Sequence, residues 1–293
     1  RQNIGEANNR GIEMNLEWRD KTESGFEYNV GVNMSTIRNR MTKLNGGTPI
    51  SDGPFRNGSM YLTYTNEGMP IGAFWGYKTD GLIQTQEQLN AVKRADFQPN
   101  AELGDVLFVD TNGDGKLDSS DRCMIGNPIP DIIYGINMGM AWKGFDLNLQ
   151  FGGTIGNQIF NAMRYYTYFP NDITNKDRAL MNYWTPNNTN TDIPRLTATD
   201  VNDNDRFSDM YVENGTYFRL RNAQLGYTLP ASLTQRIKLQ KVRFYVSGQN
   251  LFTISSYSGM DPEVGQSSSL SRGIDYGIYP QNISFTGGIN VTF

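Results

Sequence analysis

The feature that most constrains this fold is a strict alternation of apolar and polar residues, which recurs in segments of about ten residues. The last segment shows it best, with one side formed by Ile283, Phe285, Gly287, Ile289, Val291 and Phe293. The same pattern occurs at 11–19, 26–36, 132–142, 145–152 and 241–252. A period of two residues is typical of β-strands and gathers the apolar side chains on one face of a sheet.

A seventh segment, 216–227, alternates less regularly. Its apolar residues before Arg221 have one parity, and those after Asn222 have the other. One extra residue in the strand would restore a common face, so the sequence predicts a β-bulge at this point.

The connections between these segments alternate between short and long. The short ones are Asp20–Gly25, Lys143-Gly144 and Leu229–Gln240, and the long ones are about 38–131, 155–215 and 253–281. Outer-membrane barrels have this asymmetry, with short periplasmic turns and long extracellular loops. The sequence therefore predicts an all-β chain whose strands form transmembrane barrel wall, with the three long loops outside the cell. A soluble β-sandwich with one wet face also alternates and remains the alternative.

The long loops contain some expected order of their own. Residues 71–83 are predicted to form short extended structure, and 85–95 and 174–184 to form short helices.

Composition excludes several classes of protein. The net charge of −4 does not suit nucleic-acid binding. The absence of histidine removes Ser-His-Asp and Cys-His catalysis and His-ligated metals, and Cys123 is the single cysteine. Asp203, Asp205 and Glu213 could supply acid and base carboxylates, but a solvated loop is the favoured interpretation. We therefore expect no enzyme activity.

One segment has the spacing of a cation-binding loop. Residues 110–121 place oxygen side chains at positions 1, 3, 5, 9 and 12, and Gly115 at position 6. This is the spacing of a twelve-residue calcium loop, with Asp in place of the usual final Glu. The predicted ligands of a structural Ca²⁺ are Asp110, Asn112, Asp114, Lys116 through its carbonyl, Asp118 and Asp121. The alternative is a metal-free turn, since Asn-Gly and Asp-Gly pairs are common in hairpins.

An aromatic cluster lies at 165–169 in the second long loop, and single tryptophans lie at 75 and 184. The candidates for contact with a substrate or partner are Trp75, Tyr165, Tyr166, Tyr168 and Trp184. Packing within the loops or an interfacial aromatic girdle is the favoured interpretation of these residues.

A series of short motifs extends over nearly the whole chain. The most distinctive lie at 3–13, 70–81, 104–115, 121–135, 215–230, 247–253, 259–263 and 291–293. They include Ile125-Gly-Asn-Pro-Ile-Pro-Asp and Gly215-Thr-Tyr-Phe-Arg-Leu-Arg-Asn. Together and in this order they resemble the SusC-like branch of TonB-dependent outer-membrane transporters from Bacteroidetes.

The resemblance implies a 22-stranded antiparallel barrel with an N-terminal plug, in which residues 1–293 supply about the last seven strands. It also implies a SusD-like surface lipoprotein as partner, energy from the TonB complex through the missing N-terminal part, and uptake of oligosaccharides or peptides. The chain begins at Arg1 without Met or a signal pattern, so we expect a piece of a longer protein without its plug. The alternative function is a calcium-stapled β-sandwich that binds glycans at the cell surface without transport.

Overall fold

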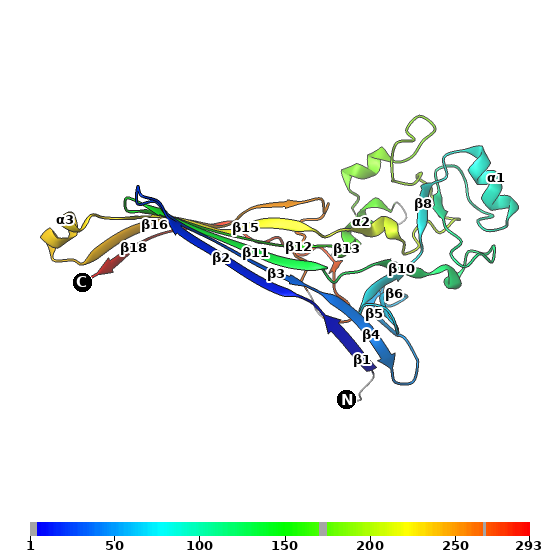
Figure 1. Ribbon diagram of the computed structural model, residues 1–293. Helices are drawn as coiled ribbons and strands as arrows, with labels where there is room; N and C mark the ends of the chain where they lie inside the picture. Colours follow the sequence, from blue (N-terminus) through cyan, green and yellow to red (C-terminus); the bar gives the residue numbers. More distant parts are fainter. Residues whose placement is uncertain (1–4, 170–174, 266–267) are drawn as a thin grey trace.

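The computed structural model describes residues 5–169, 175–265 and 268–293. It consists of a long, narrow sheet and a cap of short elements at one end of it (Figure 1). No helix in the described ranges is both long enough and apolar enough to cross a membrane.

Seven antiparallel strands form the long sheet, in the order β18-β16-β15-β12-β11-β3-β2. In chain order they are β2 (Glu13–Lys21), β3 (Glu27–Thr36), β11 (Ile132–Trp142), β12 (Phe145–Ile155), β15 (Tyr217–Thr228), β16 (Lys241–Ser255) and β18 (Ser284–Thr292). Each corresponds to one of the segments selected by its alternation, so the strand prediction is confirmed.

The register of the sheet brings the apolar positions of all strands onto one face. One cross-strand row consists of Leu16, Val32, Ile136, Phe151, Leu220 and Phe252. This face is not covered: Leu16 is 60% exposed, Trp18 64% and Phe285 79%. A β-sandwich would bury such a face against a second sheet. The structure of the described residues therefore contradicts the sandwich alternative.

The predicted bulge is present in β15. The register of β15 skips Arg221 against both neighbours, so that Leu220 pairs with Phe151 and Asn222 pairs with Gln150. The extra residue keeps Leu220 and Ala223 on the same apolar face. The prediction of a bulge near Arg221-Asn222 is confirmed.

Short turns lie at one end of the sheet and long connections at the other (Figure 1). Lys143 and Gly144 join β11 to β12 with φ values of 48° and 88°. Two positive φ values are those of the type I′ turn that matches the twist of a hairpin. Between β15 and β16 lie the helix α3 (Ala231–Thr234) and the 3-10 turn η4 (Gln235–Ile237).

The long connections build the cap from small sheets. The first of these sheets has four strands: β5 (Ile50–Phe55), β6 (Met60–Thr65), β7 (Ala73–Gly76) and β10 (Cys123–Gly126). The second contains β13 (Gln158–Asn161), β14 (Val212–Asn214) and β17 (Ile274–Asp275). Two-stranded pairs are β8 (Thr79–Leu82) with β9 (Val106–Phe108), and β1 (Gly5–Arg10) with β4 (Arg38–Leu44).

The helical segments of the cap are short. They are α1 (Gln86–Arg94), α2 (Ala162–Tyr168), η1 (Ser119–Asp121), η2 (Arg178–Asn182) and η3 (Asp209–Tyr211). The helix predicted at 85–95 is confirmed, with Thr85 and Gln88 forming a capping box. In the segment 174–184 the structure has the 3-10 turn η2 rather than an α-helix, and residue 174 lies outside the described residues. The extended structure predicted at 71–83 is present as β7 and β8.

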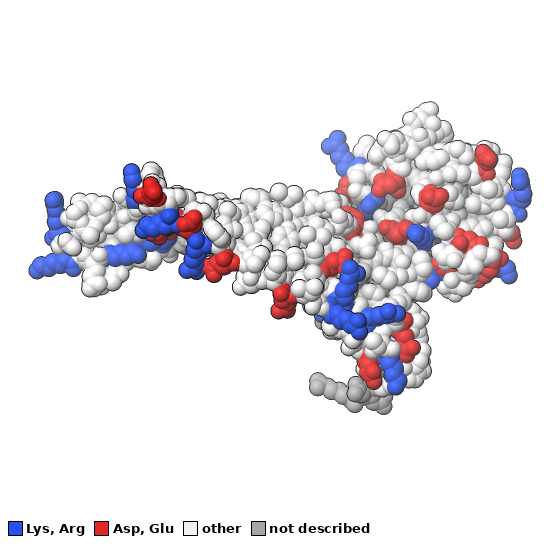
Figure 2. Space-filling view, viewed as in Figure 1, with Lys and Arg blue, Asp and Glu red and all other residues white. Residues whose placement is uncertain are grey.

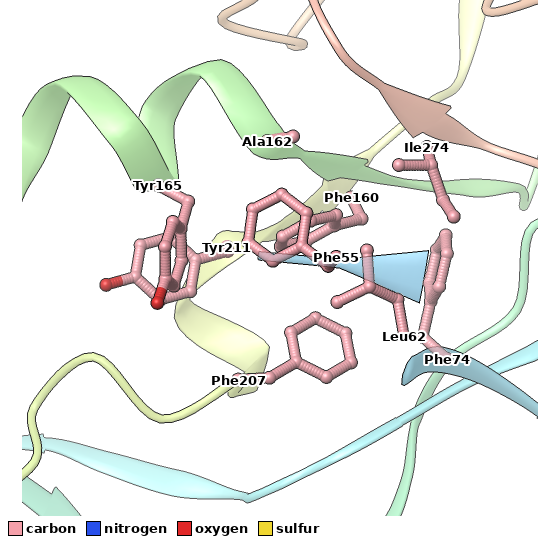
Figure 3. Packing of buried hydrophobic residues seen from close by; sticks show 9 residues of the cluster. All are labelled: Phe55, Leu62, Phe74, Phe160, Ala162, Tyr165, Phe207, Tyr211 and Ile274. Atoms are coloured by element: carbon pink, nitrogen blue, oxygen red, sulfur yellow. The ribbon is translucent and has the colours of Figure 1, made fainter. Parts of the chain in front are cut away.

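All three long connections contribute to one hydrophobic core in the cap (Figure 3). Phe55 and Phe74 come from the first, Phe160 and Tyr165 from the second, and Ile274 from the third. The rings of Phe55 and Phe160 meet edge to face at 5.5 Å between centroids. This shared core fixes the three connections as one folded unit instead of separate loops.

A buried ion pair attaches the last long connection to the polar face of the sheet. Arg219 of β15 is 2% exposed, and its Nη2 donates to Asp261 Oδ1 at 2.5 Å. Its Nη1 donates to Glu263 at 2.9 Å, and Arg221 donates to the same carboxylate at 3.0 Å. Burial alone would raise the pKa of Asp261. Hydrogen bonds from the amides of Gln281 and Glu263 and from Arg219 outweigh this effect and lower the pKa below its usual value, so this carboxyl is ionised.

Removal of Asp261 tests this attachment. We expect Asp261→Ala to cost about 3–5 kcal/mol of stability, because it leaves the Arg219 charge buried without its partner. Thermal unfolding measures the loss, and trypsin cleavage at Arg272 reports loosening of the connection. Glu17→Ala is the control, because the Glu17–Arg19 pair is exposed and contributes at most about 1 kcal/mol. Equal stability of the two variants would contradict the role of this ion pair.

Candidate functional site

The loop predicted to bind calcium connects β9 to β10 and is closed by its own carboxylates. Asp110 accepts hydrogen bonds from the amides of Gly113 at 2.7 Å and Gly115 at 2.8 Å. Both glycines have φ near 77°, a conformation that other residues rarely adopt. The buried Asp121 accepts from the amides of Thr111 and Asp118.

These hydrogen bonds favour ionised carboxylates. The amide of Gly115 lowers the pKa of Asp110, and the amide of Ser120 lowers the pKa of Asp118. In the described part of the chain, however, no three Asp, Glu, Cys or His side chains are grouped closely enough to hold a metal ion. Calcium binding by Asp110, Asn112, Asp114, Lys116, Asp118 and Asp121 therefore stays a prediction.

Two of the five candidate aromatic residues lie inside the cap. Tyr165 is 3% exposed and packs on Phe55, with ring centroids 4.9 Å apart. Trp184 is 6% exposed, and its indole N–H donates to Gln84 Oε1 at 2.8 Å. Buried rings cannot present their faces to a ligand, so the structure favours packing for both residues.

The other three aromatic candidates are half-buried. Trp75 stacks on Tyr64 at 4.6 Å between ring centroids. Tyr166 packs against Phe55 at 5.1 Å, and Tyr168 lies beneath the guanidinium of Arg164 at 5.2 Å. Each ring already has a partner within the cap, and the structure does not bring the three together.

The acidic residues considered for catalysis are held in structural interactions. Asp205 pairs with Arg56, and Asp203 pairs with Arg206. Glu213 accepts hydrogen bonds from Asn161 and from the hydroxyl of Ser258. The sequence favoured a solvated loop for these residues, but Asp205 and Glu213 are half-buried and Glu213 lies in β14.

Sequence reasoning missed a cavity of about 460 Å³ between the polar face of the sheet and the cap. Ile133, Thr154 and Tyr217, which are neighbours in one cross-strand row, contribute its sheet side. The remaining lining comes from Asn9, Ile37, Asn39, Ile71, Pro128, Ile129, Pro130, Asn157, Ile159, Pro262, Glu263, Val264, Ser269, Arg272 and Gly273. The cavity thus collects residues from all three long connections.

The lining combines aliphatic surface with one unsatisfied cation. Arg272 is half-buried and forms no hydrogen bond or ion pair with any described residue. The nearby carboxylate of Glu263 is already bonded to Arg219 and Arg221. Such a site suits a ligand with apolar groups and a carboxylate. Its sequence signals are the motifs at 125–131 and 259–263, which line it.

No family model matches the chain. Individual relatives, however, align with it from end to end. TonB-dependent receptor P3 of Formosa agariphila is 37% identical over 304 residues, and receptor P26 of the same organism is 30% identical over 300 residues. TonB-dependent receptor SusC of Bacteroides thetaiotaomicron is 27% identical over 293 residues. Each alignment covers 100% of this chain and 29%, 30% and 27%, respectively, of the relative.

Solved structures give the same fold. A structure of the RagAB peptide transporter matches with a TM-score of 0.77 and 24% identity. The RagAB peptide importer in its closed-closed state matches with a TM-score of 0.75 and 25% identity. Both matches cover 100% of this chain and 30% of the other chain.

The chain is thus a mostly β-strand part of a TonB-dependent receptor, which implies a bacterial outer-membrane location. Within that class it is homologous over its full length to the SusC-like receptors, as the motifs indicated. The named relatives are TonB-dependent receptors, in agreement with the expectation of no enzyme activity.

Substitution of the tryptophans separates packing from ligand contact. We expect Trp184→Ala to destabilise the protein by about 3–5 kcal/mol, because it leaves a cavity in the core of the cap. Trp75→Ala is the comparison and should cost less, since Trp75 is half-buried. Thermal unfolding of both variants measures the difference. A Trp184→Ala protein of unchanged stability that binds ligand more weakly would contradict the packing role.

Proposed function

We propose that this chain forms the last seven or so strands of a 22-stranded barrel wall that crosses the outer membrane several times. The apolar face supports this, because large apolar side chains on six of its seven strands, all but β3, are more than a third exposed. At about 3.3 Å per residue and a tilt of about 40°, an eleven-residue strand such as β11 rises roughly 25 Å, the height of the apolar band of such barrels. The cap then faces the cell exterior, opposite the short turns.

We infer that the complete receptor is a nutrient importer. Its partners would be a SusD-like surface lipoprotein over the cap, the TonB complex acting through a plug outside this chain, and the lipid around the wall. The likeness to the RagAB peptide transporter supports the partner lipoprotein and the import role. No residue of this chain carries out covalent chemistry in this function; the chain binds, guides and encloses cargo.

Between glycans and peptides, the cavity beside Arg272 favours peptides. Sugar rings stack on exposed aromatic rings, and among the described lining residues the one aromatic ring belongs to Tyr217, which is 5% exposed. Isoleucine and proline side chains instead suit apolar peptide side chains, and the guanidinium of Arg272 suits a peptide carboxylate. The observation that carries this proposal is that Arg272 has no hydrogen-bond or ion-pair partner among the described residues.

We further propose that the loop 110–121 holds one structural Ca²⁺ that staples the cap. The carboxylates of Asp110 and Asp118 are favoured in their ionised form, as a cation site requires. Binding would need the side chains of Asn112 and Asp114, which now bond to each other, to turn toward the ion.

The substrate proposal is tested with the complete receptor in detergent and a matched pair of probes. The probes are an apolar pentapeptide with a free C-terminal carboxylate and the same peptide with a C-terminal amide. We expect the acid to bind about tenfold or more tightly, because hydrogen bonds to charged groups contribute about 1.5–3 kcal/mol. Arg272→Gln should abolish the difference, measured by isothermal titration calorimetry.

Arg94→Gln is the control, because Arg94 is exposed in the last turn of α1. Equal binding of acid and amide would overturn the role of Arg272. Tighter binding of an oligogalacturonate than of either peptide would reassign the cavity to acidic glycans. A receptor in membranes that takes up neither class would contradict the importer function itself.

The calcium proposal has a separate test. Asp110→Ala with Asp114→Ala should remove one bound Ca²⁺ per chain, measured by elemental analysis after dialysis. The loss should expose the connection 38–131 to proteases, since the loop would no longer be cross-linked by the ion. Asp80→Ala, an exposed change elsewhere in the cap, is the control. Unchanged metal content in the double variant would exclude calcium at this loop.

A further inference from the structure

Three arginines gather where β1 and β4 extend the β2–β3 hairpin beyond the long sheet. Arg10 of β1 lies directly opposite Arg38 of β4, and Asn8 lies opposite Arg40. They line a hollow of about 460 Å³ together with Asn8, Asn39, Met41, Thr42 and Gly68. Figure 2 shows blue side chains gathered at this junction of sheet and cap.

Strand parity places the arginines on the outward side. Arg10 lies on the same side of its strand as Ile12, Leu16 and Trp18 of the apolar face. The side chains of these three residues are 70%, 60% and 64% exposed. The amide of Thr36 donates to the carbonyl of Ile12 at 2.9 Å and keeps the two strands paired across this point. The residues of opposite parity, Asn9 and Asn39, bond to each other and line the cavity on the polar side.

The charge of this group is poorly compensated. Arg38 reaches Asp131 at 3.8 Å, in a pair whose side chains are 81% and 50% exposed. Arg10 donates to Asn8, a neutral group, at 3.2 Å. Arg40 forms no ion pair with any residue in the described ranges. Like charges directly opposite each other on paired strands are destabilising unless an anion lies between them.

The height of the group matches the lipid headgroups. Arg10 lies two residues beyond Ile12, about 7 Å along the strand. The headgroup region extends about 5–8 Å beyond the hydrocarbon on each side of a bilayer. An arginine at this position reaches phosphate, and its planar guanidinium suits phosphate bidentately.

We propose that Arg10, Arg38 and Arg40 form a binding site for a phosphorylated lipid headgroup of the outer leaflet. A phosphate between the two strands removes the repulsion between Arg10 and Arg38 and brings Arg40 a counterion. The bound lipid anchors the hairpin that carries Asn9 and Asn39, and so supports the wall of the neighbouring cavity. This site rests on the proposed barrel orientation.

Native mass spectrometry of the complete receptor tests the site. The probes are purified lipid A, dephosphorylated lipid A and inorganic phosphate. The native receptor should retain one lipid A and no dephosphorylated lipid. The variant Arg10→Gln/Arg38→Gln/Arg40→Gln should lose lipid A affinity by about tenfold or more, because it removes charged hydrogen bonds to phosphate.

The matched control is Arg19→Gln/Lys143→Gln/Arg236→Gln, which removes three exposed basic residues near the short turns. Heat-modified gel mobility checks that each protein keeps its barrel. Unchanged lipid retention by the first triple variant, or equal retention of dephosphorylated lipid, would overturn the site. If inorganic phosphate bound as tightly as lipid A, the ligand of the site would be a free anion and the lipid proposal would be wrong. Failure of the native receptor to enter bilayers would instead contradict the barrel proposal.

Discussion

The structure depends on continuous backbone pairing between strands whose side chains alternate with a period of two. Every strand inside the sheet bonds to two neighbours, and within the described residues the sheet's own outer edges are those of β2 and β18. A shift of one residue in any pair would turn apolar side chains to the polar side. The bulge at Arg221 therefore matters, because it restores the common face within β15. Hydrogen bonding and side-chain pattern thus enforce one register together.

The sheet alone buries few side chains. The end that carries the long connections is therefore stabilised by the core of the cap. Its core takes Phe55, Phe160 and Ile274 from three separate connections, which makes each connection depend on the others. The buried Arg219–Asp261 pair then joins this unit to the polar face. As a result the last connection is held against the wall, where it also forms one side of the cavity beside Arg272.

The sequence predicted the elements whose pattern is local. Period-two alternation located all seven strands of the sheet, and the segment 85–95 was predicted as the helix that the structure has as α1. It could not predict the core of the cap, because the aromatic rings that contact Phe55 come from residues more than a hundred positions away in the chain. For the same reason the sequence left ligand contact open for Tyr165 and Trp184 beside the favoured interpretation of packing, and tertiary packing buries both residues. The cavity and the Arg10–Arg38 pair escaped notice since each needs contacts between distant segments.

On the polar face of the sheet, long polar side chains lie flat over glycines of neighbouring strands. Arg243 lies flat across β15 and donates to Asp146 of β12 at 2.9 Å. It can do so because residue 226 is glycine: a Cβ there would lie 2.3 Å from Arg243 Nη2. Asn29 lies in the same way over Gly139, where a Cβ would meet its side-chain oxygen at 2.2 Å. Glycines beside long polar residues therefore let charge and amide groups bond along the wall instead of projecting from it. In the barrel proposed above, such strands keep the polar groups of the inner face satisfied.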